Sequence, residues 1–78
     1  MRELLLHHEL YSLPALQKTV EVFAGVGRVE LHHELPHYRV EIVGEAGERE
    51  AELAGEFGNY ALALTVEERR NVDPTGHR

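Results

Sequence analysis

Two copies of one histidine-containing pentapeptide hold most of the residues in this chain that could do chemistry. Leu-His-His-Glu-Leu occurs at residues 6–10 and again at residues 31–35, and these copies contain four of the six histidines. Imidazole and carboxylate groups bind zinc and similar divalent ions, and two of each can complete a tetrahedral site. The repeat therefore predicts a metal site formed by the first histidine and the glutamate of each copy: His7, Glu9, His32 and Glu34.

The strands that carry the two copies decide whether those four side chains converge. Apolar and polar residues alternate over 3–10 and 28–35, which is typical of β-strands with one face toward a core. Neighbouring strands lie about 4.8 Å apart and one ion can bridge them, whereas an intervening strand doubles the gap and excludes a shared ion. In the alternative interpretation these are solvated strand residues that pair weakly. His8 and His33 are expected to face the core or the rim of a helix layer.

A helix and a further strand are predicted around the second copy. Ser12 is a suitable N-cap and Pro14 fits the first turn of a helix over 13–24. A third strand is predicted over 38–43. It follows the second strand so closely that the two should form an antiparallel hairpin.

The remaining residues predict a second helix and a tail. Residues 44–47 resemble a turn, and apolar residues recur at helical spacing over 48–64. Thr65 followed by Glu68 fits a capping box, which predicts a separate short helix after Thr65. Residues 73–78 are rich in turn-forming residues and are expected to be disordered.

The order strand, helix, strand, strand, helix predicts an α+β fold. We expect one domain over residues 1–72, with a three-stranded sheet whose helices lie on one face. The other face should be polar. A chain of 78 residues builds only a small core, so association into a homodimer is expected, by a sheet edge or by the apolar helix surface around Tyr60 and Leu62.

The composition of the chain argues against two classes of binding partner. The net charge is −6 and the basic residues form no stripe, which argues against nucleic acid and against an acidic membrane surface. The apolar run at residues 4–6 is too short for a signal peptide or membrane span, so a cytoplasmic protein is expected.

The residue types and their spacing do not predict a catalytic site. There is no cysteine, the single serine is Ser12, and no glycine-rich phosphate loop is present. We therefore expect no enzyme, and a histidine acting at a dimer interface ranks last among the alternatives.

Two short segments resemble a known family. The first, Leu-Tyr-Ser-Leu-Pro-Ala-Leu at residues 10–16, leads into the predicted first helix. The second, Glu-Phe-Gly-Asn-Tyr-Ala-Leu at residues 56–62, is followed by Glu-Glu-Arg-Arg at residues 67–70. Over about residues 4–70 the chain resembles the small D protein of the His-Xaa-Ser system, a bacterial peptide-modification locus that encodes radical-SAM enzymes. The resemblance implies an accessory role beside a maturase or its peptide substrate, and no catalytic residues.

The expected function is therefore that of a non-catalytic accessory protein that binds a peptide or another protein. An exposed sheet edge can accept a peptide as an added strand, although edges can also be blunted by charges or used for dimerisation. The alternative is a metal-binding protein that holds zinc or another divalent transition metal at the four residues of the repeat.

Overall fold

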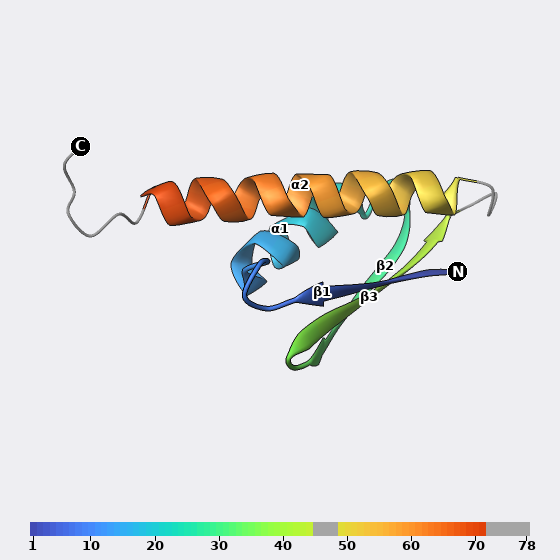
Figure 1. Ribbon diagram of the computed structural model, residues 1–78. Helices are drawn as coiled ribbons and strands as arrows, with labels where there is room; N and C mark the ends of the chain where they lie inside the picture. The colour runs from blue at the N-terminus through green and yellow to red at the C-terminus, as the bar shows by residue number, and fades with distance from the viewer. Residues whose placement is uncertain (45–48, 72–78) are drawn as a thin grey trace.

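The computed structural model describes residues 1–44 and 49–71. Its elements are β1 (Arg2–His7), α1 (Leu13–Phe23), β2 (Gly27–Glu34), β3 (His37–Gly44) and α2 (Glu50–Asn71). The three strands form one sheet, and both helices lie on the same side of it (Figure 1). The fold is α+β with the predicted order of elements.

Strand β3 is the middle strand of the sheet. It pairs antiparallel with β1 on one side and with β2 on the other, so β1 and β2 are parallel but not adjacent. The hairpin register places Gly27 opposite Gly44, where a Cβ on Gly27 would lie 2.7 Å from the carbonyl oxygen of Val43. Only glycine fits this close approach of the two strands.

The core lies between the sheet and the helices. Alternate strand residues point into it and meet the apolar sides of α1 and α2. Its buried members are Leu6, Leu16, Val40, Ile42, Leu53, Ala54, Phe57 and Ala61. Phe23 is half-buried at the margin of this core, with its ring centroid 5.4 Å from that of Phe57.

The start of α1 is tied to the C-terminal half of α2. The hydroxyl of Ser12 accepts a hydrogen bond from the backbone N–H of Ala15 at 3.2 Å, which caps the helix. The backbone N–H of Ser12 itself donates to the Thr65 hydroxyl oxygen at 3.1 Å. Thr65 is fully buried, and its hydroxyl donates to the carbonyl oxygen of Ala61 at 2.9 Å.

Helix α2 is continuous, so the predicted break at Thr65 is wrong. The Thr65 side chain bonds within the helix and to Ser12 instead of capping a new helix. Among the described residues, no helix combines the length and the apolar character needed to cross a bilayer. The predicted turn after Gly44 and the predicted tail over 73–78 lie outside the described residues.

Candidate functional site

The sheet face turned away from the helices is mostly polar. We call it the open face. Its rows across β1, β3 and β2 are His7–His37–Glu34, Leu5–Arg39–His32 and Glu3–Glu41–Glu30. Because side chains alternate between the two faces of a strand, these nine residues share one surface.

Arg39 lies at the centre of the open face and binds three of its carboxylates. Its Nη2 lies 2.8 Å from Glu34 Oε2, and its Nε donates to both Glu34 oxygens at 3.1 Å. Its Nη1 lies 3.4 Å from Glu3 and also donates to Oε2 of Glu41. The hydrogen bond from Arg39 is the main reason why the pKa of the Glu34 carboxyl lies below its usual value.

The first pentapeptide leaves the sheet after His7. Strand β1 ends there, and the His7 carbonyl oxygen accepts from the N–H groups of Leu10 and Tyr11 at 3.0 and 3.1 Å. Nδ1 of the His7 ring accepts from the N–H of Glu9 at 3.1 Å. The predicted strand through residue 10 is therefore too long, and Glu9 lies in a turn instead of on the open face.

The predicted four-residue metal site does not form within one copy of the chain. Strand β3 separates β1 from β2, which is the arrangement that keeps His7 and His32 from sharing an ion. The register adds a stagger, because His7 lies in the row of Glu34 and His32 lies in the row of Leu5. The condition for a site shared within one chain, that the two strands are neighbours, is therefore not met. Residue alternation defines the faces of strands and leaves their order open.

The structure brings a different set of possible ligands together. Glu30, His32 and Glu41 each offer one ligand atom, and these atoms lie within 4.8 Å of one another. The sequence signal for this set is the hairpin: counting back from the turn at Leu35 and Pro36 places Glu30 opposite Glu41.

The second histidines of the two copies are both exposed. His33 lies on the helix side of β2, at the rim, with its ring centroid 5.7 Å from that of Tyr38. His8 lies just beyond β1, where its ring stacks on His7 with centroids 4.9 Å apart. His33 thus occupies the helix-layer rim that the sequence allows, and His8 does not enter the core.

Strands β1 and β2 each have one edge without a strand partner among the described residues. Along β1, residues 4–6 are all leucine, and Leu5 is 62% exposed on the open face. The corresponding residues of β2 are Leu31, His32 and His33, so His32 takes the place on the open face that Leu5 has on β1. Since charges on an edge discourage pairing with another chain, β1 is the better acceptor for an added strand.

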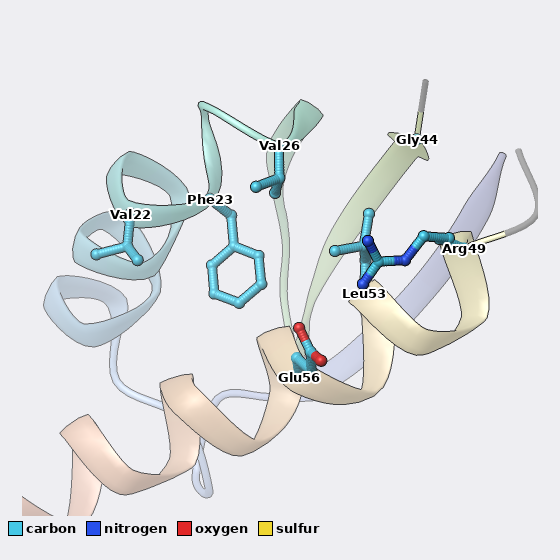
Figure 2. A pocket seen from close by; sticks show the side chains of 7 residues that line it. All are labelled: Val22, Phe23, Val26, Gly44, Arg49, Leu53 and Glu56. Atoms are coloured by element: carbon cyan, nitrogen blue, oxygen red, sulfur yellow. The ribbon is translucent and has the colours of Figure 1, made fainter. Parts of the chain in front are cut away.

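A pocket of about 410 Å³ lies on the helix side of the sheet, between the C-terminal end of α1 and the N-terminal end of α2 (Figure 2). Its lining is Val22, Phe23, Val26, Gly44, Arg49, Leu53 and Glu56. Arg49 is held by Glu52 at 3.0 Å, so its guanidinium is already paired. The pocket can hold a small apolar group, and it lies on the opposite face of the sheet from His7, His32 and His37.

Known proteins add no further assignment. No family model matches the chain, and neither a curated protein nor a solved structure shows significant similarity to it.

Proposed function

We propose that this protein is a non-catalytic cytoplasmic binding protein whose strand β1 accepts an extended peptide segment of a partner. The observation that carries the proposal is the contrast between the two sheet edges. On β1 the side chain in the middle of the open face is the exposed, apolar Leu5, whereas the same row of β2 holds His32, with Glu30 and Glu34 on either side of it.

An added strand would gain both hydrogen bonds and apolar burial at β1. Backbone groups on the free edge supply the hydrogen bonds, and alternate side chains supply specificity. Full burial of a leucine is worth ~1.5–3 kcal/mol, so covering the exposed part of Leu5 would add about 1–2 kcal/mol. The neighbouring carboxylate of Glu3 favours a peptide that places a basic residue beside it and an apolar residue beside Leu5.

The resemblance to the small D protein of the His-Xaa-Ser system supports the same proposal. In such a system the added strand would belong to a peptide substrate or to a radical-SAM maturase, and this protein would act as an accessory to the chemistry. Residues 10–16, which carry part of the resemblance, run from the turn after β1 into the start of α1.

Nuclear magnetic resonance would test the proposal directly. The ¹⁵N-labelled protein is titrated with a synthetic precursor peptide from a His-Xaa-Ser locus, and the largest amide shifts are expected in β1. Leu5→Lys should weaken binding, because it places a charge on the edge. Leu35→Lys is the matched control, since Leu35 is 67% exposed in the hairpin turn. Shifts confined to β2 or α2, or equal loss in both variants, would refute the proposal.

Self-association is part of the same proposal. Leu62 and Val66 are exposed and line a shallow hollow on α2 together with Ala63 and Arg70. Glu56 and Arg70 are equally spaced before and after Ala63, so helical periodicity places both near the same side of α2. Two antiparallel copies of α2 centred near Ala63 would bury this surface and set each Glu56 against the Arg70 of the second copy.

Sedimentation velocity tests this dimer. The wild type should have the dimer mass at micromolar concentration, Glu56→Arg should dissociate it, and adding Arg70→Glu to that variant should restore it. A monomeric wild type would end the idea.

A further inference from the structure

We propose that Glu30, His32 and Glu41 form a binding site for a divalent transition-metal ion on the open face. The site shares only His32 with the four residues that the repeat predicts. Glu30 and Glu41 are direct cross-strand partners in the β2–β3 hairpin. His32 lies two residues along β2 from Glu30, so all three side chains leave the same face.

The distances within this group fit a shared ion better than hydrogen bonds. Nε2 of His32 lies 3.6 Å from Oε1 of Glu30 and 3.6 Å from Oε1 of Glu41. Hydrogen bonds between nitrogen and oxygen span about 2.7–3.2 Å. A tetrahedral ion with bonds of about 2.0–2.2 Å holds its ligands about 3.4 Å apart. The two distances from Nε2 are therefore close to the ligand spacing of one ion, and all three ligand atoms lie within 4.8 Å of one another.

The histidine nitrogen has an unmet requirement. Although the His32 side chain is 34% exposed, its Nε2 atom is shielded from solvent. Within residues 1–44 and 49–71 this atom has no hydrogen-bond partner. A buried polar atom without a partner is costly, and coordination to a metal ion would satisfy it.

The surrounding charges also favour a cation. Glu3, Glu41 and Glu30 lie side by side in one row, and like charges directly opposite each other destabilise a sheet. Arg39 contacts Glu3 and Glu41 in this row, but no contact joins it to Glu30 among the described residues. A divalent ion between Glu30 and Glu41 would relieve the repulsion that Arg39 leaves.

Arg39 acts as a positioning residue for this site. It donates to Oε2 of Glu41, which leaves Oε1 of the same carboxylate directed at His32. Arg39 is itself held by two Glu34 oxygens. Such outer contacts typically change metal affinity 10–100-fold when they are removed.

The donor set defines the class of ion. One imidazole nitrogen and two carboxylate oxygens suit zinc, manganese or ferrous iron, whereas calcium and magnesium prefer oxygen ligands alone. Three protein ligands leave a coordination position open to water. We therefore expect zinc and manganese to bind in preference to magnesium and calcium.

Calorimetry and thermal denaturation on untagged, chelator-treated protein test the site with ZnCl₂ and MgCl₂ as probes. Zinc should bind one ion per chain and raise the melting temperature, while magnesium at the same concentration should do neither. Glu30→Gln and His32→Gln should abolish the response. Glu30→Gln keeps the side-chain shape at an exposed position and so retains the fold. His7→Gln is the matched control, because His7 occupies the same place in the other pentapeptide, and it should bind zinc as the wild type does.

Three results would overturn the proposal. One is the absence of zinc binding by the wild type up to millimolar ion. Another is unchanged zinc binding by folded Glu30→Gln and His32→Gln. The third is loss of binding in His7→Gln with retention in His32→Gln, which would assign the ion to the rings of His7, His8 and His37 at the end of the sheet.

Discussion

The two copies of Leu-His-His-Glu-Leu have the same sequence and different structures. In the first copy, Leu6 and His7 end β1 and the next three residues form a turn. In the second copy, the residues from Leu31 to Glu34 are all in β2. The ring of His7 accepts a hydrogen bond from the backbone N–H of Glu9 in the same copy, while the ring of His32 faces two carboxylates.

Contacts outside the pentapeptides explain the difference. Helix α2 holds the segment after β1, since Arg69 Nη2 donates to the Glu9 carbonyl oxygen at 2.7 Å and Thr65 accepts from the N–H of Ser12. The second copy instead runs along β3, with Glu34 opposite His37 at the hairpin end. Tertiary contacts therefore override identical local propensity.

Substitutions of the first leucine should show the largest difference between the two copies in their effect on the stability of the protein. Leu6 is 7% exposed and belongs to the core, whereas Leu31 is half-buried at its margin. Leu6→Ala should lower the free energy of unfolding by about 2–5 kcal/mol, and Leu31→Ala by less. Urea denaturation of both variants checks this order, and an equal or larger loss for Leu31→Ala would contradict it.

Removing the α2 anchor should loosen the first copy alone. Thr65→Val keeps the shape of the side chain but leaves the N–H of Ser12 without its partner. A buried donor left unpaired costs about 1–3 kcal/mol, and because Ser12 is only partly buried we expect a loss near the lower end of that range. Hydrogen exchange should then quicken at residues 8–12 and stay unchanged in the β2–β3 hairpin. Equal acceleration in both regions would show that the anchor is not specific to the first copy.

Substitutions of the first histidine of each copy should show a smaller difference in the stability that is lost. His7→Ala removes the acceptor of the Glu9 N–H and should cost about 1 kcal/mol. His32→Ala breaks no hydrogen bond among the described residues, so it should cost less when a chelator is present. Urea denaturation with EDTA compares the two, and a larger loss for His32→Ala would reverse the interpretation.

The smallest expected effect is a pH dependence of stability that comes from Glu34, the glutamate of the second copy. Arg39 lowers the pKa of Glu34 from its ordinary 4.5, so the stabilisation by this pair is complete above that value. It is lost as the pH falls through the lowered pKa of the folded state. Between about pH 6 and pH 3, Glu34→Gln should therefore lose less stability than the wild type. Thermal melts of Glu34→Gln and the wild type over this range check the prediction, and if the two follow the same curve, the pair contributes nothing.

Elements and faces were predictable because they depend on local periodicity. Alternation over the strands correctly placed His7, His32 and Glu34 on the open face, and Ser12 correctly marked the start of α1. Strand order was not predictable, because a crossover through α1 allows β1 to lie beside either β2 or β3. The candidate site depends on that order, and so His32 is the only predicted ligand that the structure keeps in a cluster of three.

Helix α2 shows the same limit of local signals. Thr65 and Glu68 match a capping box, but Thr65 lies in mid-helix with its hydroxyl facing Ser12, far away in sequence. A buried threonine that bridges two elements and a threonine that caps a helix have the same local sequence.

The central position of β3 also orders the events of folding. Strand β1 has β3 as its only strand partner in the described residues, so it must wait until the chain has been synthesised through Gly44. The β2–β3 hairpin closes a short loop and can form alone, whereas β1 closes a much longer one at greater entropic cost. We therefore expect β1 to be the last strand to join during translation and the first to detach in the folded state. A nascent chain would therefore expose the leucines at residues 4–6 to a partner while it is still on the ribosome.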